Sequence, residues 1–211
     1  MENKTKAELE LEFIKNIIHD SRKKIEDSGD SAIMWGIIVI VGILYTYFSA
    51  LTKFYDYTLW VWLGVLSFGW IVTFIRTRNQ KKQNLPQTFA LKVQDALWIA
   101  SGISMTIIGI VCSVQFKSEV SESVPFAYII NSMAIAPTIS IILGTAYYVT
   151  GYINDSKAMT RMGYGWWVGG IIMFYWKSIH HFPLFAAMML FFQVIPGIIC
   201  YKKSKKTDAG E

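Results

Sequence analysis

Three histidines are the residues of this 211-residue chain that most readily bind metals or transfer protons. His19 lies near the start of the chain, and His180 and His181 are adjacent. An imidazole titrates near pH 6.5 (about the middle of the physiological range) and often binds transition metals, so the pair is a candidate metal site. Successive side chains of a helix point apart, however, and no third ligand lies near in sequence. We therefore expect a solvated turn, with no metal or cofactor.

Most intramembrane chemistry needs an ionisable group at depth, and the six long uncharged runs of this chain have none in their interiors. This pattern argues against a proton relay, an ion-coupled transporter, a retinal Schiff base and a Ser–His protease. The HExxH zinc motif, the P-loop, the kinase signature and the Rossmann fingerprint do not occur in the sequence. We expect a protein that is not an enzyme. The alternative is an enzyme acting on lipid through His180 or His181 with Glu119 or Glu122.

Uncharged polar and aromatic side chains remain as material for a binding site. Pro137 lies near the middle of the fourth run and predicts a kink, because it removes the helical donor of the Met133 carbonyl. Polar groups beside a kink can line a cavity for a lipid or a small neutral solute. Our candidate ligand-binding residues are Trp70, Asn131, Pro137, Tyr147, Tyr148 and Gln193. The alternative is that these groups only join helices to one another.

The apolar runs predict the elements that would position these residues. Hydrophobic residues make up 53% of the chain and charged residues only 17%, where soluble proteins have about 25% charged residues. A bilayer core about 30 Å thick needs about 20 apolar residues of helix. The expected spans are residues 32–51, 57–75, 96–116, 126–150, 162–179 and 182–201. We predict an all-α bundle of six transmembrane helices, which three two-helix hairpins would build. The fifth run is short, so an interfacial or re-entrant segment is its alternative.

The placement of basic residues predicts the orientation of this bundle. With six crossings, one side holds seventeen Lys and Arg residues and the other side three. By the positive-inside rule both termini then lie in the cytoplasm, and the protein belongs to the inner membrane. The net charge of +5 is thus a topology signal, and we expect the lipid bilayer rather than nucleic acid as its partner. Residues 202–211 form a basic cytoplasmic tail.

Residues 1–31 are predicted to form an amphipathic cytoplasmic helix. A heptad spacing joins Ala7, Leu11, Ile14, Ile18, Ser21 and Ile25. Gly29 is the expected stop, and Asp30 or Ser31 the expected cap of the first membrane helix. The net charge of this segment is negative, which argues against an anionic membrane surface as its target. We expect Leu11, Ile14, Ile18 and Ile25 to contact a cytoplasmic partner or a second copy, or to dock on the basic loop at residues 76–95.

Three short stretches resemble parts of small bacterial integral membrane proteins that have six helices and no assigned activity. They are Leu11-Glu12-Phe13-Ile14-Lys15, Trp35-Gly36 and Val194-Ile195-Pro196-Gly197. The resemblance implies a six-helix inner-membrane protein and no particular reaction. The run lengths are also similar to those of small amide and urea channels built from three two-helix repeats.

The residues themselves predict a regulatory, sensory or scaffold protein. Its cytoplasmic tail would bind a partner, and its bundle would hold a lipid or a small apolar ligand. A passive channel or facilitator for a small neutral solute is the alternative.

Overall fold

The computed structural model describes residues 6–52, 57–81, 89–119, 125–176 and 178–208, and side chains within 29–52, 57–79, 89–111, 134–176 and 178–202. Every regular element in these ranges is helical, as predicted. The elements are α1 (Lys6–Thr52), α2 (Thr58–Lys81), α3 (Phe89–Glu119), α4 (Pro125–Ile153), α5 (Lys157–Tyr175), α6 (His181–Met189), the π-helical segment η1 (Leu190–Val194) and α7 (Ile195–Asp208).

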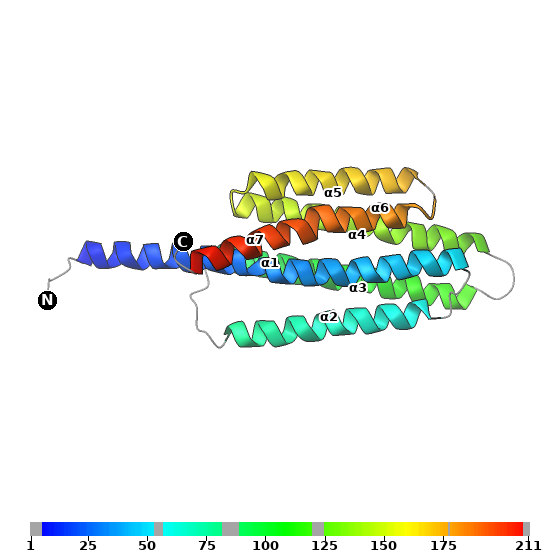
Figure 1. Cartoon of the computed structure of the whole chain (residues 1–211), viewed down its shortest axis with the longest axis horizontal. Coiled ribbons are helices and arrows are strands. Elements are labelled where there is room, and N and C mark those ends of the chain that lie inside the picture. The colour runs from blue at the N-terminus through cyan, green and yellow to red at the C-terminus, as the bar shows by residue number, and fades with distance from the viewer. Residues whose placement is uncertain (1–5, 53–56, 82–88, 120–124, 177, 209–211) are drawn as a thin grey trace.

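The helices lie side by side and alternate in direction along one long axis (Figure 1). Segments α6, η1 and α7 follow one another without a break, so they form one rod. The most extensive contacts join α4 to α5, α1 to α7 and α3 to α4. The last turn of α2, the first turn of α3, the α4–α5 turn and the end of α7 lie at the same end of the bundle, and the first half of α1 extends beyond that end (Figure 1).

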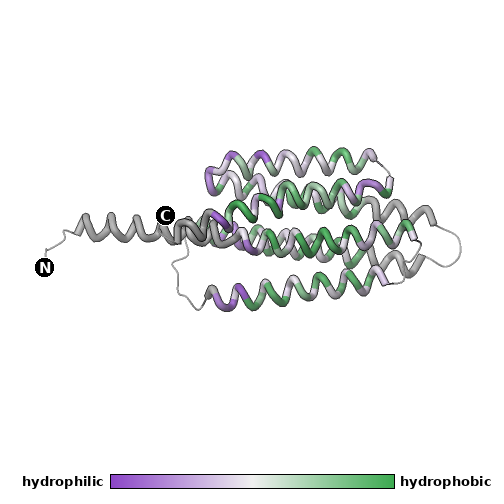
Figure 2. Tube along the Cα trace, viewed as in Figure 1, coloured by the Kyte–Doolittle hydropathy of each residue, from purple (hydrophilic) through white to green (hydrophobic). Residues whose placement is uncertain are grey.

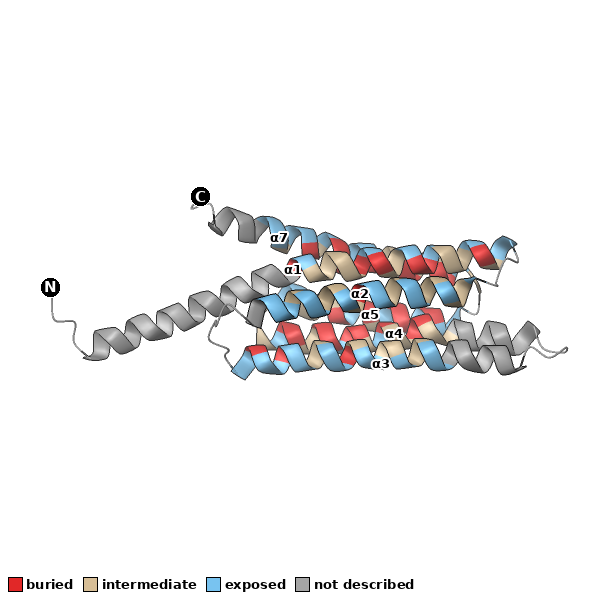
Figure 3. Ribbon diagram, turned by 90° about the horizontal axis from the view of Figure 1, so that it is seen from below, coloured by how far each residue is buried: buried red, intermediate tan, exposed pale blue. Residues whose placement is uncertain are grey.

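Much of the outer surface is apolar, as a lipid-facing surface must be. Five segments in the described residues are long and apolar enough to cross a membrane, namely Gly29–Thr52, Thr58–Asn79, Phe89–Val111, Ala134–Ile153 and His181–Lys202. Their hydrophobic residues run along most of each helix (Figure 2). Outward faces of α2 and α3 expose large apolar side chains such as Phe74 and Ile107 (Figure 3). The fold is therefore compatible with a helical membrane bundle. Helix α5 is not among the five segments.

The first helix does not stop at Gly29, contrary to our prediction. Helix α1 continues for 47 residues from Lys6 to Thr52, so the expected boundary between tail and first span falls inside it. Gly29 is buried where α1 crosses α7, and a Cβ atom there would lie 2.7 Å from the carbonyl oxygen of Gly197. A Cβ atom on Gly197 would in turn lie 2.9 Å from the carbonyl oxygen of Gly29. Gly29 thus serves close packing rather than helix termination.

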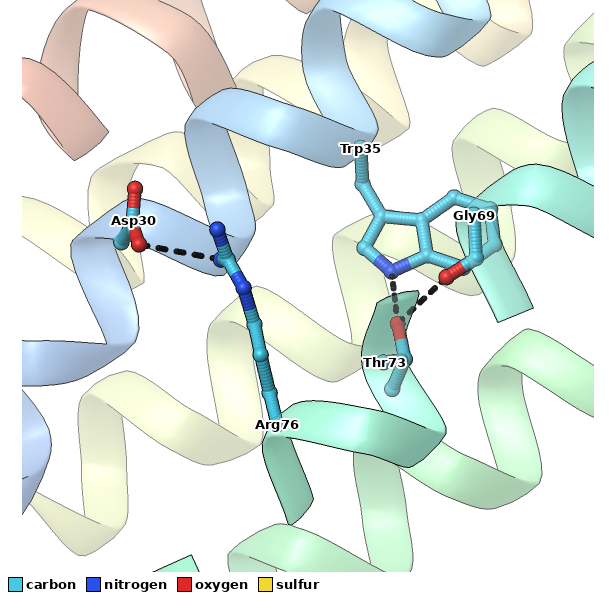
Figure 4. Close-up of polar contacts among 5 residues, drawn as sticks. All are labelled: Asp30, Trp35, Gly69, Thr73 and Arg76. Atoms are coloured by element: carbon cyan, nitrogen blue, oxygen red, sulfur yellow. Dashed lines mark hydrogen bonds and ion pairs between the residues drawn. The ribbon is translucent and has the colours of Figure 1, made fainter. Parts of the chain in front are cut away.

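The predicted cap is also absent, because α1 needs none at this point. Asp30 lies within α1, and its carboxylate forms an ion pair of 3.0 Å with the guanidinium of Arg76 on α2 (Figure 4). Ser31 lies in the same uninterrupted helix. The acidic side chain therefore links two helices near the shared end of the bundle.

Pro137 and Pro196 both lie inside helical segments and are accommodated differently. Helix α4 runs through Pro137 without interruption, and Pro137 is buried against α5. Before Pro196 the chain widens into η1, where the amide of Ile195 donates to the carbonyl of Leu190, five residues earlier. Because proline lacks an amide hydrogen, a π-turn beside it is a known way to re-register a helix.

We expect Gly29→Ala to destabilise the protein by about 1–3 kcal/mol, because the new methyl group meets backbone rather than a movable side chain. Gly64 on α2 is the matched control, since a Cβ atom there has no heavy atom within 4 Å. Gly64→Ala should be neutral or stabilising by about 0.5–1 kcal/mol, the helix preference of Ala over Gly. Thermal unfolding in detergent measures both. Equal melting temperatures for the two variants would contradict the role given to the α1–α7 crossing.

Candidate functional site

The residues predicted to line one cavity lie at separate helix contacts. Trp70 on α2 reaches towards α3, Pro137 lies under Gly170 of α5, and Gln193 on η1 contacts α1. Tyr147 is buried in the core, whereas Tyr148 stacks on α5 side chains away from it. The side chain of Asn131 lies outside the described residues. Among the side chains that the structure describes, the predicted set does not converge on a single pocket.

Aromatic rings fill the interior around Tyr147. Trp166 of α5 is fully buried, and its ring stacks on Tyr147 with the two planes 22° apart. Phe185 of α6 and Phe192 of η1 pack against Trp166 with ring centroids 5.8 and 5.9 Å away. Trp98 of α3 meets Tyr147 edge to face at 5.3 Å. In the described part of the bundle, this region is a packed core rather than a solute cavity.

Gln193 joins the π-turn to the first helix. Its Nε2 atom donates to the carbonyl oxygen of Ala32 at 3.3 Å. Its buried Oε1 atom has no partner among the described atoms. Beside it, Gly36 gives α1 a flat face, because a Cβ atom there would lie 2.5 Å from a methyl group of Val194. The amide therefore joins helices, which is the alternative that we set against ligand binding.

The two adjacent histidines do not share a site. The Nδ1 atom of His180 lies 3.2 Å from the hydroxyl of Tyr47 on α1. His181 is fully buried, and its Nδ1 atom donates to the carbonyl oxygen of Ser178 at 2.6 Å. Our prediction of a solvated turn is therefore wrong for His181, which its local hydrogen bond and its contact with Phe182 hold inside. The described residues contain no cluster of three or more potential metal ligands.

A repeated contact that the sequence analysis missed links the first three helices. In each case a Gly and the Thr four residues later on one helix hold the ring of a tryptophan, and we call this arrangement a tryptophan cradle. The threonine hydroxyl donates to the glycine carbonyl of its own helix, and it accepts a hydrogen bond from the indole N–H of a tryptophan on a neighbouring helix. The three cradles are Gly42–Thr46 with Trp62, Gly69–Thr73 with Trp35, and Gly102–Thr106 with Trp70, with indole-to-hydroxyl distances of 2.9, 3.0 and 3.2 Å.

Glycine is needed in a cradle because the ring lies against the helix backbone. A Cβ atom on Gly69 would lie 2.8 Å from the Trp35 ring, and one on Gly42 would lie 2.9 Å from the Trp62 ring (the first of these cradles is in Figure 4). Trp98 of α3 makes a related bond of 3.1 Å to Thr150 of α4. The signal in the sequence is the pattern G-x-x-x-T inside an apolar run.

A shallow depression lies at the α4–α5 turn, at the same end of the bundle as the end of α7. Its volume is about 590 Å³, and its lining includes Asp155, Lys157 and Arg161. One helical turn further along both helices, Tyr148 and Tyr164 form an aromatic group with Trp167, with ring centroids 5.3–5.8 Å apart. Comparisons of the chain with family models, curated proteins and solved structures found no match.

We expect Thr106→Val to destabilise the protein by about 1 kcal/mol, because it leaves the Trp70 indole without its acceptor in a low-dielectric setting. Thr138→Val is the matched control, since among the described residues Thr138 bonds to a carbonyl of its own helix, that of Ala134. Denaturation of both variants in the same detergent gives the comparison. A loss of stability in Thr138→Val as large as that in Thr106→Val would show that the indole bond contributes nothing.

Proposed function

We propose that this protein crosses the cytoplasmic membrane six times with both termini inside, and that it is a scaffold or regulator. In this role the bundle anchors a helix that presents a partner-binding face to the cytoplasm. The observation that carries the proposal is the continuity of α1, which extends as one helix from Lys6 to Thr52.

The sixth crossing in this proposal is α5, which hydropathy alone does not select. Its 19 residues span about 28 Å, close to the thickness of a bilayer core. In this placement the long side chains of Lys157 and Arg161 in its first two turns extend towards the lipid headgroups. It lies alongside α4 over its length (Figure 1) and exposes apolar side chains such as Val168 and Ile172. With six crossings the basic segments fall on one side, which supports cytoplasmic termini.

A continuous α1 supports a scaffold role because it fixes the cytoplasmic segment to the bundle. A helix of 47 residues is about 70 Å long, more than twice the thickness of a bilayer core. The Gly29–Gly197 crossing and the Asp30–Arg76 ion pair hold α1 where it leaves the bundle. The side chains of Leu11, Ile14, Ile18 and Ile25 lie outside the described residues, and their heptad spacing supports one shared face.

The packed interior favours this proposal over a channel. Side chains that a solute path would need, such as Tyr147 and Gln193, instead make helix-to-helix contacts. Trp166 of α5 and Phe185 of α6 are fully buried and pack against each other.

The topology can be tested with single cysteines at opposite ends of the bundle. Cys112 and Cys200 are first replaced by Ser, and Tyr152→Cys or Ser178→Cys is then introduced. We expect a membrane-impermeant maleimide to label Ser178→Cys in intact cells and Tyr152→Cys only after the membrane is opened, because the α4–α5 turn is cytoplasmic in our proposal. Labelling of Tyr152→Cys in intact cells would overturn the orientation.

The scaffold role can be tested by placing charge on the heptad face of α1. Ile14→Asp with Ile18→Asp should abolish association with the partner or second copy, measured by cross-linking in native membranes followed by co-purification. Asn16→Asp with His19→Asp is the control, because it adds the same charge on the opposite face of the helix. Both variants should melt like the wild type, since the changes lie outside the bundle. Unchanged cross-linked products in the first variant would refute the partner-binding face.

A further inference from the structure

The exposed face of α5 changes from charged to apolar along its length, as a phospholipid does from its headgroup to its acyl chains. Lys157, Arg161, Tyr164, Val168 and Ile172 follow one another at spacings of three or four residues, so they share one face. All five are exposed in the structure. From Arg161 to Ile172 this face runs about 16 Å, close to half of a bilayer core about 30 Å thick. The face is thus cationic at one end, aromatic next, and aliphatic from Val168 to Ile172.

The cationic end opens on the depression at the α4–α5 turn. Lys157 and Arg161 line this depression of about 590 Å³, together with Ser156, Thr160 and Asp155. Neither cation forms an ion pair with a described residue, so their charges remain available to a ligand. Asp155 has a φ angle of 47°, a left-handed conformation that holds the turn tight and brings its carboxylate to the same lining.

The aromatic part of the face forms a shelf at the level below. Tyr148 and Trp167 stack at 5.3 Å with planes 30° apart, and Tyr164 meets both edge to face. The shelf is built from both helices because α4 and α5 pack closely. A Cβ atom on Gly163 would lie 2.9 Å from the carbonyl oxygen of Gly144. Tyrosine and tryptophan rings favour the boundary between headgroups and acyl chains, where the glycerol backbone of a lipid lies.

We propose that the outer face of the α4–α5 hairpin is a binding site for an anionic phospholipid of the cytoplasmic leaflet. Lys157 and Arg161 hold the phosphate, the shelf of Tyr148, Tyr164 and Trp167 supports the glycerol backbone, and an acyl chain lies along Val168 and Ile172. This site is independent of the heptad face of α1. It rests on the proposed membrane placement of the hairpin, which the cysteine labelling tests separately.

The charges of the depression indicate which headgroup fits. Lys157 and Arg161 against Asp155 leave a net charge of one positive unit, which matches a phosphodiester with a single negative charge. The Asp155 carboxylate only accepts hydrogen bonds, so it favours a headgroup that carries hydroxyl donors. Phosphatidylglycerol has both properties. Phosphatidylcholine has neither a net negative charge nor a donor.

The test is native mass spectrometry of the full chain, titrated in a nonionic detergent with phosphatidylglycerol or with phosphatidylcholine of the same acyl chains. We expect one phosphatidylglycerol to be retained at least tenfold better than phosphatidylcholine. Lys157→Gln with Arg161→Gln should weaken retention of phosphatidylglycerol by roughly tenfold, as expected for loss of two cations at a phosphate. Arg78→Gln with Lys92→Gln is the control, because both residues are exposed cations on other helices.

Each outcome of this experiment bears on the proposal. Equal losses in the two double variants would indicate a general effect of net charge and would overturn the site, as would unchanged retention in Lys157→Gln with Arg161→Gln. Glycerol phosphate and inorganic phosphate are added as competitors to distinguish a lipid from a soluble phosphate. We expect neither to displace the lipid at millimolar concentration. If either does so, the ligand is a soluble phosphate and the lipid proposal is wrong. Melting curves without lipid confirm that each variant is folded.

Discussion

The close approach of helix backbones through glycine is the constraint on which the rest of this structure depends. Lipid tails are as apolar as leucine, so helices in a bilayer associate through packing rather than through exclusion of water. Gly29 and Gly197 bring α1 against α7, and Gly163 brings α5 against the Gly144 carbonyl of α4. Larger side chains at these places would hold the backbones apart. The contacts of Gln193 with α1 and of Trp166 with the core follow from that closeness.

The same constraint explains which parts of the fold the sequence predicts. Long apolar runs identify α1, α2, α3, α4 and the α6–α7 rod, because length and hydropathy are properties of each segment alone. Helix α5 begins with Lys157 and Arg161, which shorten its uncharged run, and Gly163, Gly169 and Gly170 serve packing, so hydropathy alone does not select it. The distribution of charge supports it as a crossing. The prediction of a helix end at Gly29 is wrong for a related reason, because this glycine packs against Gly197 within a continuous helix. A glycine in the sequence is typical of either a helix end or a close contact between helices. Which of the two applies depends on the helix that packs against it, and that helix can be far away in the sequence.

The candidate site was harder to predict. A polar side chain in an apolar run is expected to need a hydrogen-bond partner, but the sequence does not show on which helix that partner lies. Tyr147 and Tyr148 were assigned to one cavity, yet successive residues of a helix point about 100° apart. The structure buries Tyr147 against Trp166 and places Tyr148 on the outer aromatic group with Trp167. Gln193 and Pro137 likewise have partners on different helices. The angle between successive residues of α4 therefore separates Tyr147 from Tyr148, whereas the positions of Gln193 and Pro137 depend on contacts between helices.

The tryptophan cradles show how a thinly packed helix can still be held in place. Helix α2 is largely exposed, so broad side-chain burial contributes little to its position (Figure 3). A threonine that bonds to its own helix keeps a lone pair for an indole, and the two linked bonds strengthen each other where no water competes. Because the ring rests on glycine, each cradle also sets the distance between helices. The cradles at Thr46, Thr73 and Thr106 therefore fix α2 between α1 and α3 through directed bonds. This arrangement leaves the outward face of α2 free to match the lipid.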